Sequence, residues 1–333
     1  MGIRTHLGRV PSFASLLPVL VLWIQGCEPP DRPPALPGDL PPEAVRFLAP
    51  DRISTFQIED GVVYRAVRSS REPWSVHLLE VDLSRCELGF QVVRPQGEED
   101  RVLVSEMARR LEPGVLAGIN GDFFTPESRP LGTEVTGGET RGRTSRPGFA
   151  WRPGSLPWLG PVGWDGDSIR LGGWAADGRS PGTSLQVISG FPALLNDGEV
   201  VGDLEVEERP GFAAQRHPRT AVGLNPEASR FWIVVVDGRR EGVSEGMTLP
   251  ELTDLFRALG ARSAVNLDGG GSSVMVVRGQ PVSRPSDPAG ERAVVNALLL
   301  RRDHRYCDLG RRADPGWERA VHPGRGTEEA RAP

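Results

Sequence analysis

The order of apolar and polar positions predicts a domain rich in β-strands. Three early runs of apolar or alternating residues lie at 62–67, 76–83 and 88–93, with polar turn residues between them. Such runs are typical of half-buried strands, so we expect an antiparallel meander. A helical pattern follows at 104–111, and a short apolar strand is expected at 115–119.

The clearest pattern lies toward the C-terminal end. A buried strand is expected at 231–236, and Thr248 and Glu251 form a capping box for a helix that runs to Gly260. A second buried strand is expected at 263–267. A strand, a helix and a strand of this length normally form a right-handed crossover between parallel strands.

Each of these two strands ends next to an aspartate. Asp237 follows the first strand, and Asp268 follows the second. Parallel strands place both carboxylates on one edge of the sheet, roughly 5 Å apart if the strands are neighbours and roughly 10 Å apart if one strand intervenes. Ligands of open sheets bind at that edge, so we predict a functional site there.

Shorter segments complete the predicted fold. Strands are expected at 221–224, 274–277 and 294–300, whereas 125–185 is rich in Gly, Pro and Trp and indicates long loops and short strands. The predicted class is α+β. We expect a single domain with a mixed, mainly antiparallel β-sheet core, few helices and one strand-helix-strand crossover that carries the site.

Residues 1–26 have the plan of a signal peptide. Arg4 and Arg9 precede an apolar run at 12–24, which is shorter than the roughly 20 residues of a membrane-spanning helix. The sequence before Cys27 resembles a bacterial lipobox, in which the cysteine becomes the lipidated first residue. The alternative is an ordinary signal peptide with a chance cysteine. We predict an extracytoplasmic protein, lipid-anchored to a bacterial cell membrane.

The rest of the chain divides into three segments. Residues 27–45 are dense in proline and predict a semi-rigid tether, 46–307 form the folded domain, and 308–333 form a loose polar tail. Outside the cytoplasm, Cys86 and Cys307 either pair in a disulfide or remain two separate buried thiols.

Composition and charge exclude several functions. All 39 basic side chains are arginine, and with 44 acidic side chains the net charge is -5. No lysine is present for Schiff-base catalysis or for a Walker loop. The chain has no overall basic field, so we expect no nucleic-acid partner.

The residues after Asp268 suit an anion. Glycines at 269–271 allow a sharp turn that presents unhindered N–H groups, and Ser272 and Ser273 follow. A flexible hairpin turn is the alternative, and the adjacent carboxylate and serines argue against it. We therefore predict an anion-binding turn.

Two arginines could add positive charge to this site. Arg219 precedes a predicted strand and either clamps a phosphate or forms a surface ion pair. Asp287 and Arg292 lie in a polar loop before the last strand, which either helps to build the site or only turns the chain.

A serine hydrolase is a weaker alternative. Residues 242–246 match G-x-S-x-G around Ser244, and Asp268 and His304 follow in hydrolase order. The nucleophile must lie on a tight turn directly between strand and helix, yet residues 237–243 separate Ser244 from its strand. This separation makes the match a poor one.

No cofactor is expected. His77 and His217 lack the neighbours of a zinc site, so both are interpreted as structural histidines. A Ca²⁺ or Mg²⁺ ion between Asp237 and Asp268 is conceivable, although no recognisable metal-binding loop supports it.

Six segments in unbroken order resemble the phosphodiester glycosidase family, within about residues 60–301. The segments are INGDFF (119–124), SGFPALLNDGE (189–199), HPRTAVG (217–223), VVDGRREGVSEGMTLPEL (235–252), NLDGGGSSVMV (266–276) and PSDPAGERAVVNALL (285–299).

This resemblance implies hydrolysis of a sugar joined through its anomeric carbon to a phosphodiester, which releases the sugar and a phosphomonoester. Asp268 or Asp237 would be the nucleophile or the base for water. Animal members of the family carry glycine where Asp122 stands, so Asp122 receives no indispensable role. The implied ligands of substrate and phosphate are Asn120, Asp122, Arg219, Thr220, Asn266, Gly269, Gly270, Gly271, Ser272, Ser273, Asp287 and Arg292.

A glycan of the envelope or the extracellular space, such as an exopolysaccharide, is the expected substrate class. A non-catalytic lipoprotein that binds polysaccharide or sugar phosphate remains the alternative. The paired carboxylates argue against it, because they would weaken the binding of an anionic ligand.

Overall fold

The computed structural model describes residues 39–310, apart from 173, 176–183, 202–203 and 205–210. The predicted signal peptide, Cys27 and most of the predicted tether and tail lie outside the described residues. None of the described helices is long and apolar enough to cross a membrane.

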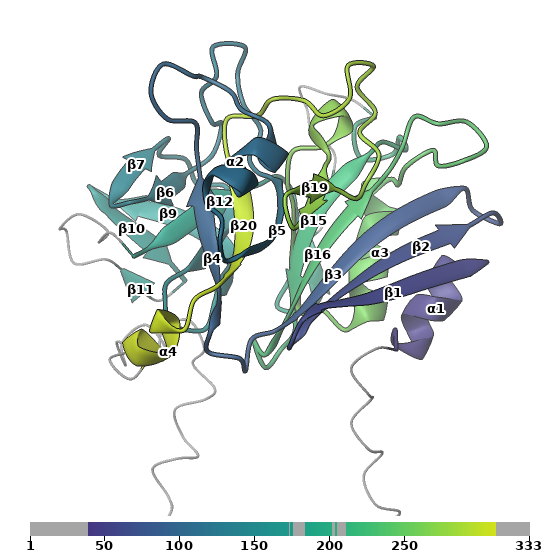
Figure 1. Ribbon diagram of the computed structural model, residues 1–333, viewed down its shortest axis with the longest axis horizontal. Helices are drawn as coiled ribbons and strands as arrows, with labels where there is room; N and C mark the ends of the chain where they lie inside the picture. The colour runs from purple at the N-terminus through teal and green to yellow at the C-terminus, as the bar shows by residue number, and fades with distance from the viewer. Residues whose placement is uncertain (1–38, 173, 176–183, 202–203, 205–210, 311–333) are drawn as a thin grey trace, which may run out of the picture. The chain divides into compact units, whose positions relative to one another are not determined.

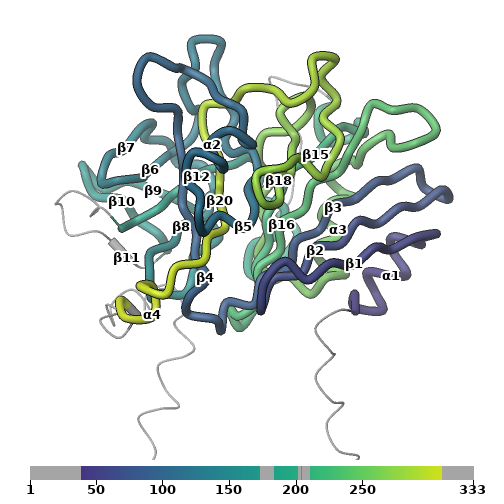
Figure 2. Tube along the Cα trace, viewed as in Figure 1, coloured from purple at the N-terminus to yellow at the C-terminus, as the bar shows by residue number. Residues whose placement is uncertain are grey.

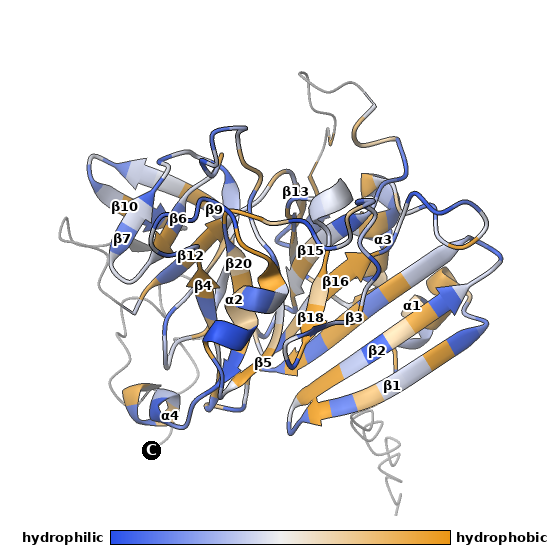
Figure 3. Cartoon of the chain, turned by 45° about the horizontal axis from the view of Figure 1, so that its top comes forward, coloured by the Kyte–Doolittle hydropathy of each residue, from blue (hydrophilic) through white to orange (hydrophobic). Residues whose placement is uncertain are grey.

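The largest sheet has eight strands and lies on the right of Figure 1. Each neighbouring pair in it is antiparallel. Polar and apolar residues are mixed along β1 and β2, as their blue and orange bands show in Figure 3. Its order is β1 (Arg52–Glu59), β2 (Val62–Ser69), β3 (Trp74–Asp82), β16 (Arg230–Val236), β15 (Arg219–Leu224), β17 (Ser263–Asn266), β13 (Ala193–Asn196) and β14 (Glu199–Val200).

Two further sheets are also antiparallel throughout their described pairs. The five-stranded sheet has the order β19 (Gln280–Pro281), β18 (Met275–Val277), β5 (Val115–Asn120), β20 (Ala297–Arg302) and β4 (Leu88–Val93). The seven-stranded sheet has the order β11 (Trp174–Ala175), β10 (Ser168–Leu171), β9 (Trp158–Asp165), β8 (Pro147–Trp151), β12 (Gln186–Ser189), β6 (Glu134–Thr136) and β7 (Glu139–Arg141).

The largest core joins all three sheets. It combines side chains such as Ile233 of β16, Leu298 of β20 and Phe149 of β8, all of them fully buried. Helices α1 (Pro42–Leu48) and α3 (Leu249–Leu259) pack on the other face of the eight-stranded sheet, and α2 (Val104–Arg110) packs against the five-stranded sheet. The eight-stranded and five-stranded sheets therefore each have one face on the central core and the other face covered by helices.

Helix α3 begins and ends where its sequence predicts. The Thr248 side chain accepts a hydrogen bond from the Glu251 backbone N–H at 3.1 Å, and the Glu251 carboxylate accepts one from the Thr248 N–H at 2.9 Å. Gly260 ends the helix in the left-handed region at φ 89°. The predicted capping box and the glycine end of the helix are confirmed.

The predicted meander is wrong in its third strand. Strands β2 and β3 pair as expected, but residues 88–93 form β4, which leaves for the five-stranded sheet and pairs with β20. Figure 2 shows the yellow β20 beside β4 and β5, far from both in sequence. Strand β1 was not predicted, because its side chains are mostly exposed and lack a sustained apolar pattern.

The two strands before the aspartates are not neighbours. Both β16 and β17 pair antiparallel with β15, so they run in the same direction with β15 between them. Among the described residues no adjacent pair is parallel, which corrects the expectation of a mixed sheet. One strand therefore intervenes between them, and the right-handed crossover stays a prediction.

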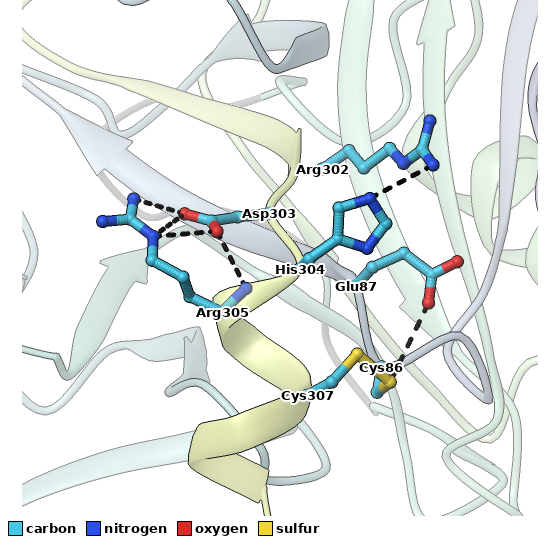
Figure 4. The surroundings of a disulfide bond; sticks show 7 residues. All are labelled: Cys86, Glu87, Arg302, Asp303, His304, Arg305 and Cys307. Carbon is cyan, nitrogen blue, oxygen red and sulfur yellow. Dashed lines mark hydrogen bonds and ion pairs between the residues drawn. A yellow bond between two sulfur atoms is a disulfide. The ribbon is translucent and has the colours of Figure 1, made fainter.

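Both ends of the domain extend beyond the predicted boundaries. Residues 42–45 belong to α1 rather than to the tether, because Ala44 and Leu48 are buried against the eight-stranded sheet. At the other end, α4 (Arg305–Gly310) continues the fold past residue 307. Cys307 of α4 is bonded to Cys86 with an S–S distance of 2.06 Å (Figure 4).

Candidate active site

A cavity of about 470 Å³ opens beside the N-terminal end of β15. Asp268, the turn at 269–271 and Ser272 line it, together with four basic side chains and an apolar wall. The basic side chains are His217, Arg219, Arg239 and Arg292, and the wall contains Phe123, Phe124, Leu131 and Phe212. Among the described lining residues, three arginines therefore surround one carboxylate.

Backbone contacts hold Asp268 firmly in place. Its N–H donates to the Gly121 carbonyl at 3.0 Å, and its own carbonyl accepts from the Asn120 side chain at 2.6 Å. One carboxylate oxygen accepts from the Gly269 N–H at 2.9 Å. Gly270 then takes φ 61° to start the 3-10 turn η1 (Gly270–Ser272), a conformation that favours glycine. The turn thus fixes the carboxylate at the cavity wall.

Arg219 is a buried cation that faces this cavity. Only 1% of it is exposed, and its guanidinium donates to the carbonyls of Met247, Phe212 and Gln215 at 2.7–2.9 Å. Burial, followed by the charge of Arg239, lowers the pKa of Arg219 to about 10. Neutral carbonyls orient the guanidinium without neutralising it, so its positive charge can act on an anion in the cavity.

Two more guanidinium groups lie against the glycine turn. A side chain on Gly270 would meet Arg239, and one on Gly271 would meet Arg292. The Arg292 guanidinium donates two hydrogen bonds, of 2.8 and 3.0 Å, to the Asp287 carboxylate, which orients it. The N–H of Ala289 and the hydrogen bond from Arg292 lower the pKa of Asp287, so it stays ionised.

Sequence reasoning missed Arg239, although it follows Asp237 by only two residues. It also interpreted His217 as purely structural and did not foresee the aromatic wall. The signal for Arg239 was its position directly after a strand that ends at the sheet edge. Burial and the charges of Arg219 and Arg239 lower the pKa of His217, which favours its neutral form.

Asn120 and Thr220 support the site from beneath. Both are fully buried, and the Thr220 hydroxyl donates to the Asn120 side-chain oxygen at 2.8 Å. That oxygen also accepts from the Val274 N–H at 3.1 Å, while the amide nitrogen holds the Asp268 carbonyl. Neither residue lines the cavity, so their geometry supports the turn rather than direct contact with a ligand.

Asn266, Ser272 and Ser273 contribute buried polar atoms near the turn. The Asn266 side-chain oxygen and both serine hydroxyls have no hydrogen-bond partner among the described residues. Of the three, only Ser272 lines the cavity. Its hydroxyl can therefore serve a bound ligand or water.

Asp122 is a second carboxyl group close to Asp268. It is 2% exposed, and one of its oxygens accepts from the Gly132 N–H at 2.6 Å, while the other has no partner among the described residues. Burial is the main reason that its pKa rises to about 8, and the charge of Asp268 raises it slightly more. Asp122 is therefore largely protonated at neutral pH and does not line the cavity.

Asp237 points to the opposite face of the eight-stranded sheet. Side chains alternate along β16, so Val235 faces the central core and Val236 faces α3. Arg219 is the register partner of Val236 and shares its face. Asp237, one residue further on, turns away from the cavity. Its catalytic role stays a prediction.

The geometry of Ser244 argues against a serine hydrolase. Its hydroxyl is fully buried, donates to the Asp237 carbonyl at 2.7 Å and accepts from the Ser75 N–H at 2.9 Å. His304 lies beside the disulfide and contacts Arg302 (Figure 4). Ser244 and His304 do not form a catalytic pair.

Metal ligands are sparse within the described ranges. The one group of three candidate ligands whose donor atoms lie close together consists of Cys86, Glu87 and Cys307. Its two sulfur atoms are bonded to each other, which removes both thiolates as ligands.

Comparison with known proteins identifies a family. The model of the phosphodiester glycosidase family matches residues 113–301, more than half of the chain. N-acetylglucosamine-1-phosphodiester alpha-N-acetylglucosaminidase of Bos taurus is 28% identical over 217 residues, which are 60% of this chain and 38% of that protein. The chain thus spans well under half of the bovine protein.

Solved structures share the fold. The catalytic domain of the zebrafish N-acetylglucosamine-1-phosphodiester alpha-N-acetylglucosaminidase, auto-inhibited by its pro-peptide, superposes with a TM-score of 0.54 at 24% identity, covering 75% of this chain and 81% of that one. A putative exported protein of Burkholderia pseudomallei K96243 superposes with a TM-score of 0.53 at 21% identity, covering 68% and 74%.

Proposed function

This chain belongs to the phosphodiester glycosidase family, and on that basis we propose that it hydrolyses the bond between the anomeric carbon of a sugar and a phosphodiester. The products are the free sugar and a phosphomonoester. The observation that carries this proposal is the cavity that combines Asp268 with Arg219 and the turn at 269–271.

The charges in the cavity suit the departing phosphate. A phosphodiester carries one negative charge, and the phosphomonoester that leaves carries two when the bond to the sugar breaks. Arg219, Arg239 and Arg292 therefore stabilise the transition state more than the bound substrate. The backbone N–H groups of the turn at 269–271 point positive dipole ends toward an anion and add to this stabilisation.

Asp268 supplies the carboxylate that the sugar carbon needs. As nucleophile it attacks that carbon directly, and as base it takes a proton from the attacking water. Phosphate is a better leaving group than an alcohol, so a strong acid is not required on the other side. Hydrolysis of the glycosidic bond is therefore possible with Asp268 as the one lining carboxylate among the described residues.

We also propose that the substrate is a glycan of the envelope or the extracellular space. The signal peptide predicted at 1–26 and the lipidation predicted at Cys27 support a protein anchored outside the cytoplasm. The bond between Cys86 and Cys307 agrees with an oxidising compartment.

The test is a panel of sugar-1-phosphodiesters incubated with the purified protein, in which free sugar and phosphomonoester are followed together. Equal release of both products supports the proposal, and Asp268→Asn should abolish it without changing thermal unfolding. Binding of the panel without any release would instead indicate a sugar-phosphate binding protein.

A further inference from the structure

Asp237 is the acceptor at the centre of a buried hydrogen-bond network. One carboxylate oxygen accepts from the Ser75 hydroxyl at 2.9 Å and contacts His77 Nε2 at 3.2 Å. The other oxygen accepts from the Arg284 backbone N–H at 2.8 Å. The residue is 4% exposed, and none of these partners lines the cavity.

The network continues away from the site to Tyr64. Its hydroxyl lies 2.7 Å from His77 Nδ1, and both side chains are buried. The carboxylate of Asp237 can only accept, so His77 Nε2 carries a hydrogen. In the neutral ring Nδ1 then accepts from the Tyr64 hydroxyl. Burial would raise the pKa of Asp237, but the hydrogen bond from His77, the charge that His77 carries when protonated, and the hydrogen bonds from Arg284 and Ser75 outweigh burial and lower that pKa.

Backbone contacts tie the same residue to its surroundings. The Asp237 N–H donates to the Ser75 carbonyl at 2.9 Å, and its carbonyl accepts from the Ser244 hydroxyl at 2.7 Å. Ser244 in turn accepts from the Ser75 N–H. The serine of the apparent nucleophile motif thus closes the turn that follows β16.

Two loops that depend on this network carry cavity arginines. The first loop begins at Asp237 and brings Arg239, in a left-handed conformation at φ 57°, against the glycine turn. The second loop is held at Arg284 by the Asp237 carboxylate and leads to Arg292, which lies against the same turn. The Asp237 carboxylate is the hydrogen-bonded link between the two loops.

We propose that Asp237 is a positioning residue, whose buried carboxylate joins these two loops and thereby places Arg239 and Arg292 over the glycine turn. This inference rests on the proposed function insofar as the two arginines hold the substrate phosphate. Asp237 acts through the arginines and exchanges no proton or bond with the substrate.

Asp237→Asn distinguishes a positioning role of Asp237 from a role as nucleophile or base. In Asp237→Asn the amide oxygen still accepts from the Arg284 N–H. The amide nitrogen donates to the Ser75 hydroxyl or to His77 Nε2, which then has no hydrogen. His77 Nδ1 becomes the protonated nitrogen and donates to Tyr64, so the network persists with its directions reversed.

The experiment compares Asp237→Asn and Asp237→Ala with the wild type in three measurements. These are kcat and KM on a hydrolysed sugar phosphodiester, the Kd for inorganic phosphate by calorimetry, and the ¹⁵N shifts of His77. Asp268→Asn is the catalytic control. Tyr64→Phe is the structural control, because it leaves every contact of Asp237 in place.

Asp237→Asn should keep kcat and the phosphate Kd within about threefold of wild type and move the His77 hydrogen to Nδ1. Asp237→Ala should raise the phosphate Kd about tenfold or more and should lower both kcat and kcat/KM, because the displaced arginines act more on the transition state than on the bound substrate. If the alanine variant does not fold, the asparagine variant decides alone. A fall in kcat of about 100-fold in Asp237→Asn, with unchanged phosphate affinity, would overturn the proposal.

Phosphate affinity keeps this test separate from the proposed function. If the wild type hydrolyses no member of the panel, the proposed function fails, but the Kd for phosphate still reports how well the arginines are placed. An equal phosphate Kd in Asp237→Ala and wild type would then reject the positioning role on its own.

Discussion

Asp122→Asn is expected to stabilise the protein, and the gain should grow with pH. The wild-type carboxyl group is buried, and this burial outweighs its backbone hydrogen bonds, so its pKa rises from 3.8 to about 8. Asparagine has the same shape, and its oxygen can accept the same bond from the Gly132 N–H. The substitution removes the ionisation while it leaves the packing in place.

The magnitude follows from the difference between the folded and unfolded pKa values. Well below pH 3.8, Asp122 is protonated in both the folded and the unfolded protein, so its ionisation costs no stability. As pH rises toward 8, the unfolded chain releases a proton that the folded chain retains, which costs about 1.4 kcal/mol per pH unit. The wild type therefore loses about 4 kcal/mol by pH 7 and about 6 kcal/mol above pH 8, relative to a residue that does not titrate.

Urea unfolding of both proteins at pH 5, 6, 7, 8 and 9 measures this difference. The free energy of unfolding of the variant minus that of the wild type should climb through pH 7 and become level above pH 8. A difference that stays constant from pH 5 to pH 9 would refute the reasoning. Asp303→Asn is the matched control. Arg305 lowers the pKa of Asp303, so the destabilising effect of this substitution should stay constant from pH 5 to pH 9 and disappear only in acid.

Four further changes test other parts of the structure. Arg219→Lys should lower kcat/KM about 100-fold, because an ammonium group cannot keep three carbonyl bonds and also face the cavity; steady-state kinetics and thermal unfolding separate this from misfolding. Gly271→Ala would place a methyl group 2.3 Å from Arg292 Nη2, so kcat/KM should fall roughly tenfold while the Tm hardly moves. Replacing Cys86 and Cys307 together by serine opens a link across a sequence separation of 221, and urea unfolding should show a loss of up to about 5 kcal/mol with activity retained in the folded protein. Thr248→Ala removes the capping box of α3 and should cost about 1 kcal/mol in the same assay, whereas an unchanged midpoint would contradict the role of the cap.

Local signals in the sequence were enough to place the elements around the site. The capping box predicted α3, and the apolar run at 231–236 predicted β16. Partners of strands were harder to foresee, because pairing depends on which surfaces a core brings together and not on the strand's own residues. Strand β4 has the pattern of a meander strand, yet it pairs with β20, about 200 residues later.

The site itself was only partly visible in the sequence. The turn at 269–271, Arg219 and Arg292 were predicted, because glycines, a carboxylate and arginines are informative residue types. The aromatic wall was not predicted. Phenylalanine is common in any hydrophobic core, and Phe123 and Phe212 come together only in the fold. Asn120 and Thr220 were interpreted as ligands because their polar groups gave no sign that each would satisfy the other.

Strand geometry explains why two aspartates at one edge of the sheet have such different surroundings. Asp237 lies one residue beyond Val236, whose side chain faces α3, so it turns toward the central core and meets His77. Along β17, Val265 faces the central core, and continued alternation places Asp268 on the α3 side with Arg219. A difference of a single residue in how far each aspartate lies past its strand therefore assigns one carboxylate to the cavity and the other to the network beneath it. Inserting one residue directly before Asp237 should exchange its buried partners for the cationic cavity, and loss of phosphate binding in that variant would follow from the displaced Arg239.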